Sequence, residues 1–133
     1  MDEAMISLKV VRKPKRVRKK KPKLVLLNKS DFQKIGNKTA GIIKFRVRAG
    51  LLPDGTAFPP GVDLVETGLL IESLGAHKST RNRTIISTHA YYAGAVNARY
   101  GFMGLNDEEA VEVYAFIERL VGENIDEYEA SLG

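Results

Sequence analysis

Ten basic side chains lie within the fifteen residues KVVRKPKRVRKKKPK, and no acidic residue lies among them. We call this stretch, residues 9–23, the basic segment; its cations are Lys9, Arg12, Lys13, Lys15, Arg16, Arg18, Lys19, Lys20, Lys21 and Lys23. Like charges at this density repel one another and the stretch has little apolar surface to bury, so it is not expected to fold alone in water. The pattern predicts a nucleic-acid-binding arm, with a solvated tail or a localisation signal as the alternatives.

The composition of the basic segment also indicates the kind of binding. It contains no aromatic residue on which single-stranded bases could stack, and no Asn or Gln suited to reading base edges. Lys and Arg alone neutralise phosphates whatever the sequence of the bases. The segment therefore predicts sequence-independent contact with the phosphate backbone of a duplex, and its residues do not distinguish DNA from RNA.

Catalytic and metal-binding chemistry is not indicated by the sequence. There is no cysteine, and the only two histidines, His77 and His89, match no metal-binding spacing. The cluster Asp107-Glu108-Glu109 is explained by helix capping after Asn106. We therefore expect no enzyme activity, no cofactor, no metal and no small-molecule substrate.

Charge is distributed unevenly along the chain. Residues 1–50 hold sixteen Lys or Arg against three acids, whereas residues 51–133 hold five against thirteen, which together give the net charge of +5. The first half is thus suited to phosphates, and we expect the second half to face away from them. Further candidate contacts outside the basic segment are Lys29, Lys34, Lys38, Lys44, Arg46, Arg48, Arg81 and Arg83.

The N-terminal half is expected to form an arm, residues 1–50, bent at Pro14 and Pro22. Ser30 is a candidate N-cap for a helix that follows, but residues 43–48 alternate apolar and basic as a strand would. Helix and short strand both remain open there. Residues 51–61 are rich in Pro and Gly and are expected to form a connector.

The C-terminal half, residues 62–133, is expected to be a compact bundle of three to four helices. Residues 62–74 predict a helix that ends at Gly75, and a second helix is expected from Ser79 or Thr80 to about Tyr100. A third is expected to begin at Asn106 and to end at Gly122. The predicted fold is therefore mainly α.

This organisation resembles that of the capsid proteins of filamentous or rod-shaped double-stranded DNA viruses of hyperthermophilic archaea. The resemblance rests on the Pro-bent basic segment, the connector, and the helix expected over STRNRTIISTHAYYAGAVNARYGF. It implies a nearly all-helical structural protein of the virion that wraps DNA and assembles into a helical filament, with itself or a second related coat protein as partner. It also implies localisation in the virion, and in the host cytoplasm during assembly.

Other functions also fit the sequence. A ribosomal or other RNA-associated structural protein of a thermophile would carry a similar basic extension, and so would a chromatin-type DNA-compacting protein. The basic segment could also meet anionic lipid at a membrane surface, although no apolar face accompanies it. No apolar run reaches the length of about eighteen residues that a transmembrane span needs, so none is expected.

Overall fold

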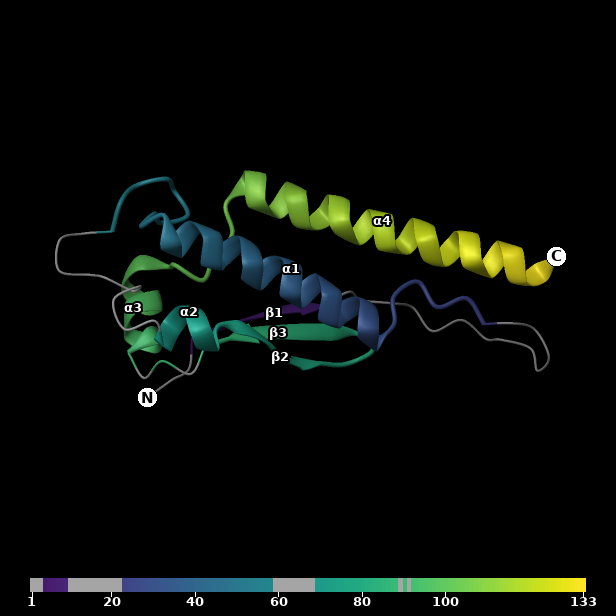
Figure 1. The fold of residues 1–133 in the computed structure, drawn as a ribbon, viewed down its shortest axis with the longest axis horizontal. Helices are drawn as coiled ribbons and strands as arrows, with labels where there is room; N and C mark the ends of the chain where they lie inside the picture. The colour runs from purple at the N-terminus through teal and green to yellow at the C-terminus, as the bar shows by residue number, and fades with distance from the viewer. Residues whose placement is uncertain (1–3, 10–22, 59–68, 89, 91) are drawn as a thin grey trace.

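The computed structural model describes residues 4–9, 23–58, 69–88, 90 and 92–133. The described chain has three layers: a three-stranded sheet, helix α1 across one face of it, and helix α4 against the other side of α1 (Figure 1). In chain order the elements are β1 (Met5–Lys9), α1 (Lys29–Arg48), α2 (Leu69–Ser73), β2 (Gly75–Ser79), β3 (Arg83–Ser87), α3 (Ala93–Tyr100) and α4 (Asp107–Leu132).

The sheet joins a strand near the N-terminus to two strands from the second half of the sequence. Its strand order is β1-β3-β2 and both pairings are antiparallel, so β3 is central and is paired with β1, a strand from far earlier in the chain. The register places Lys9 opposite Arg83 and Ile6 opposite Ile86. Residues 4–9 of the predicted N-terminal arm therefore belong to the same sheet as the C-terminal half.

The predicted mainly α fold is wrong, because the described residues form a mixed α/β fold with an antiparallel sheet. The error lies chiefly in the helix expected from residue 79 or 80 to Tyr100. Its first part is β3, in which the β-branched Thr84 and Ile86 are fully buried and alternate with more exposed neighbours, and only Ala93–Tyr100 is helical. The helix expected over residues 62–74 falls partly outside the described residues, and its described part contains the short helix α2.

Helix α1 resolves the choice left open at residues 43–48. The helix runs without interruption to Arg48, and Ala40, Ile43 and Val47 bury one face of it against the sheet. Its N-cap is Asn28 rather than the predicted Ser30: the Asn28 side chain accepts from the backbone of Asp31, and Asp31 accepts from the backbone of Asn28. A short strand at 43–48 is therefore wrong.

Two apolar cores hold the layers together, one on each side of α1. The first lies between α1 and the sheet, with Ile43, Val47, Leu74, Ile86 and Phe102 among its most buried members. The second lies between α1 and α4 and contains Leu27, Phe32, Ile35, Val113 and Leu120. Because α1 contributes to both cores, it is the structural centre of the molecule.

Helix α4 begins as the sequence predicts, with a capping box between Asn106 and Glu109. It does not end at Gly122 but continues to Leu132. Asn124, two residues beyond that glycine, donates hydrogen bonds to the carbonyl of Leu26 and to Asp31 Oδ2, at 2.7 and 2.9 Å. These tertiary contacts support the helix past a residue whose intrinsic helix propensity is about 1 kcal/mol poorer than that of alanine.

Candidate nucleic-acid interface

The cations predicted to contact phosphates fall into two sets. Eight of them lie outside the described residues: Arg12, Lys13, Lys15, Arg16, Arg18, Lys19, Lys20 and Lys21. The other ten are described and belong to β1, to the residues around α1, and to the hairpin of β2 and β3. Lys9 is the last residue of β1, and the described chain resumes at Lys23.

Three strands bring cations to one face of the sheet. A Cβ added to Gly36 of α1 would lie 2.5 Å from the Cβ of Ala76 and nearer still to Thr84 Oγ1, so Ala76 and Thr84 face α1. Arg83, the neighbour of Thr84, therefore points to the opposite face, and its register partner Lys9 shares that face with it. Lys78 of β2 lies opposite Ile85, so it joins them on the face away from α1.

We call Lys9, Lys78 and Arg83 the sheet-face cations, and all three are exposed. Cα atoms of directly opposed residues in antiparallel strands are about 4.5–5.5 Å apart, so Lys9 and Arg83 hold two positive charges close together. Like charges directly opposite each other cost stability, of the order of 0.2–1 kcal/mol for such a pair. A bound anion would remove this repulsion, which makes this end of the sheet face a phosphate-binding candidate.

Lys78 was missing from the contacts predicted from the sequence. Residues 75–79, GAHKS, show no apolar–polar alternation, so the sheet face of Lys78 follows only from the register with β3. Arg81 and Arg83 were interpreted as the first turn of a helix, which is wrong: Arg83 lies in β3, and Arg81 is exposed in the turn before it. That turn is closed by the Thr80 backbone N–H, which donates to the Arg83 carbonyl at 2.8 Å.

The cations of α1 divide according to their distance from α4. Lys29, Lys34 and Arg48 are exposed, as is Lys23 before the helix, and Lys44 is half-buried. Two others pair with carboxylates of α4: Lys38 Nζ lies 3.0 Å from Glu112 Oε1, and Arg46 forms an ion pair with Glu109. The acidic helix therefore packs directly on the basic one and neutralises two of its cations, while α4 lies on the side of α1 opposite the sheet.

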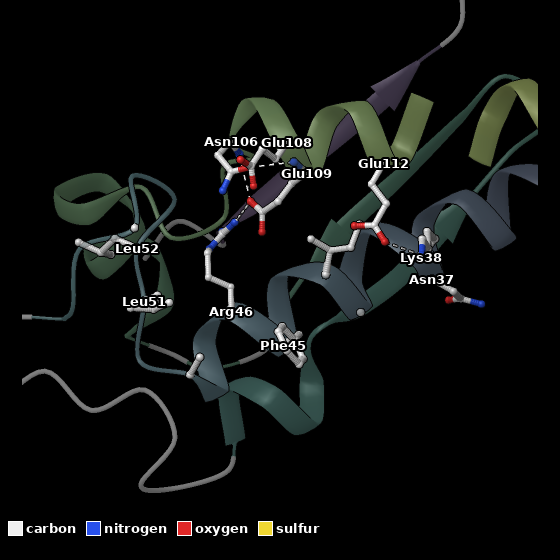
Figure 2. A pocket seen from close by; sticks show the side chains of 14 residues that line it. Asn37, Lys38, Phe45, Arg46, Leu51, Leu52, Asn106, Glu108, Glu109 and Glu112 are labelled. Carbon is white, nitrogen blue, oxygen red and sulfur yellow. Dashed lines mark hydrogen bonds and ion pairs between the residues drawn. The ribbon is translucent and has the colours of Figure 1, made fainter. Parts of the chain in front are cut away.

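Arg46 occupies the most enclosed of these positions. Its side chain is 5% exposed, and its guanidinium donates to Glu109, as Figure 2 shows. It also donates to the carbonyls of Phe102 and Gly104. Burial lowers the pKa of Arg46, and the charge of Glu109 together with the hydrogen bond to it acts in the opposite direction. Arg46 links α1 to α4, and its charge is neutralised by Glu109 inside the fold. It is therefore not part of the proposed interface.

A groove of about 770 Å³ lies beside this ion pair, between the second half of α1, the connector and the first turns of α4 (Figure 2). Its wall includes Phe45, which is 78% exposed, and Leu51, with the carboxylates of Glu108 and Glu112 at the α4 side. These carboxylates belong to one helix, and no nucleophile paired with a base lines the groove. The absence of enzyme activity remains a prediction.

Among the described residues, no three His, Asp or Glu side chains gather closely enough to hold a metal ion. No helix within the described part of the chain is both long and apolar enough to cross a membrane. Comparison of the chain with protein-family models, with curated proteins and with solved structures finds no match.

Proposed function

We propose that this protein is a structural, non-enzymatic protein that binds the phosphate backbone of duplex nucleic acid without reading its sequence. The observation that carries the proposal is the density of the basic segment: ten cations in fifteen residues, with no acid among them. Each cation that meets a phosphate releases a condensed counterion, and this release supplies most of the free energy of non-specific binding.

The fold supports the proposal at the first residue of the basic segment. Lys9 ends β1 and lies opposite Arg83, with Lys78 on the same sheet face, so the segment starts beside two further exposed cations. A phosphate backbone that follows the segment can therefore continue onto the sheet. The exposed cations Lys23, Lys29 and Lys34 lie where the chain resumes, at the start of α1.

The biological role that we propose is the packaging of double-stranded DNA in a virion, with assembly of the protein into a helical filament. The charge pattern supports the binding of a duplex, whereas the virion and the filament are what the resemblance to capsid proteins implies. The sheet departs from the nearly all-helical subunit of those proteins. Electron microscopy of the protein mixed with long duplex DNA tests the assembly. Regular filaments that contain DNA are expected; a protein that stays dispersed, or that co-purifies with ribosomes, contradicts the packaging role.

The contribution of the sheet can be measured separately from that of the basic segment. In the double variant Lys78→Ala and Arg83→Ala, which leaves the basic segment intact, the slope of log K against log salt on random-sequence duplex DNA should become shallower by about 1.8, which is about 0.9 for each lost phosphate contact. The matched control is Arg119→Ala, because Arg119 lies on α4, 3.7 Å from Glu123, and above the ring of Phe116.

The control variant should leave the slope unchanged. If the double variant also leaves it unchanged, the sheet takes no part in binding. A duplex RNA of the same length, titrated in parallel, distinguishes a DNA-packaging protein from an RNA-associated one.

A further inference from the structure

The two edges of the sheet differ in how they are protected against pairing with another strand. On the β2 edge the register shifts between Ala76 and Lys78, and the Gln33 side chain donates to the Ala76 carbonyl at 3.1 Å. A bulge and an occupied carbonyl both discourage the addition of a strand, whereas a lysine is present on each edge, Lys78 on β2 and Lys9 on β1. The β1 edge has no bulge: all five of its residues pair in continuous register with β3, and within the described residues β1 has no strand on its other side.

An apolar hollow of about 160 Å³ lies next to β1. Leu8 and Lys9 form its β1 side, Phe32 and Ile35 of α1 contribute to its wall, and Ala110 and Ile117 of α4 line it as well. Tyr114 of α4 also lines it and is 66% exposed. A strand added to β1 would extend the sheet beneath α4, and every second side chain of that strand would point toward the hollow.

The sequence of β1 fits one particular partner for this edge, which is β1 itself. When the strand MISLK is paired antiparallel with a second copy and Ser7 lies at the centre, all five residues find a partner. Lys9 then lies opposite Met5, so no two like charges face each other, and Ile6 lies opposite Leu8. Ile6 and Leu8 are half-buried and lie on the α1 side of the sheet, which is the side of the hollow.

We propose that two copies of this protein associate through β1, antiparallel and centred on Ser7, to form one continuous six-stranded sheet. A two-fold axis perpendicular to the sheet relates the copies, so both α1 helices cover the same face. The sheet-face cations of both copies then lie together on the opposite face. The pairing does not depend on the proposed nucleic-acid binding, and its test contains no nucleic acid.

A single cysteine tests this register directly, because the chain has no cysteine of its own. In the paired sheet the two Ser7 Cα atoms are about 4.5–5.5 Å apart, which lies within the range of about 4.4–6.8 Å that a disulfide spans. We expect Ser7→Cys, reduced and then exposed to oxidised glutathione at micromolar concentration, to form a covalent dimer on a non-reducing gel. The matched control is Lys78→Cys, an exposed position of the same sheet face on the protected edge.

The control should cross-link at least about tenfold more slowly. Equal cross-linking rates of the two variants overturn the proposal, and so does a native chain that sediments as a monomer at the concentration of the cross-linking reaction.

A second variant tests the same position without covalent chemistry. Ser7→Lys places two like charges opposite each other and should raise the dissociation constant of the dimer by about fivefold. Sedimentation that shows a dimer unaffected by this exposed substitution means that the interface lies elsewhere.

Discussion

The ion pair between Arg46 and Glu109 joins α1 to α4, and the substitution Glu109→Gln tests its role. Glutamine keeps an oxygen that can accept from the Asn106 backbone, so the capping box can persist while the negative charge is lost. Arg46, which is 5% exposed, then keeps its charge with only neutral oxygens as partners: the carbonyls of Phe102 and Gly104 and the retained amide oxygen of residue 109. Breaking a buried pair on one side costs about 3–5 kcal/mol, and because these carbonyls remain we expect about 3 kcal/mol.

An unfolding entropy of about 2.1 cal/mol/K per residue converts this loss into a decrease of the melting temperature of about 10 °C for a chain of this length. Circular dichroism during heating, or urea titration at 25 °C, measures the change. The matched control is Glu112→Gln at the pair with Lys38, whose side chains are 36% and 54% exposed. An exposed pair contributes at most about 1 kcal/mol. If Glu109→Gln costs no more than Glu112→Gln, the buried charge does not govern the contact between the helices and our reasoning about Arg46 is refuted.

Two further predictions concern the packing of α1 and the connector. Gly36→Ala should destabilise the protein by about 1–3 kcal/mol in urea titrations, because its new Cβ would overlap Thr84. Gly41→Ala should instead stabilise the protein by up to about 1 kcal/mol, because nothing lies within 4 Å of its Cβ. Equal effects of the two substitutions would contradict the close packing of α1 on the sheet at Gly36. Hydrogen bonds from Thr56, first from its side chain and then from its backbone, lower the pKa of Asp54 from 3.8, so the stability that they contribute is present above pH 3.8 and is lost as the pH falls through the lowered pKa. Thr56→Val should return the pKa of Asp54 toward 3.8, which an NMR titration measures. An unchanged pKa would show that the side-chain hydrogen bond from Thr56 is not the main cause of the lowering.

Local signals near helix ends predicted the structure well. The Asn106 capping box with Glu109 is confirmed as the start of α4, because side chain and backbone lie within three residues of each other. The same chemistry at Asn28 and Asp31 begins α1, but Ser30 offered a competing cap that only the geometry excludes. Residue types were therefore sufficient at Asn106, but they did not decide between Asn28 and Ser30 or predict that α4 continues past Gly122.

Long-range pairing could not be predicted in the same way. The residues of β3 fit a helical stripe as well as a strand, and they form a strand because β1, some seventy residues earlier in the chain, pairs with every one of them. Arg46 was grouped with phosphate-binding cations because its burial depends on Glu109 and Phe102, which come from distant parts of the chain. The face to which Lys78 belongs likewise depends on a register that no single strand encodes.

The salt dependence of binding to random-sequence duplex DNA tests the central claim most directly. Neutralisation of about ten phosphates by the basic segment predicts a slope of log K against log salt near −9, or steeper where further cations join. Duplexes of unrelated sequence should bind with the same affinity at constant salt. A slope near zero, or a strong preference for one sequence at constant salt, would contradict the account.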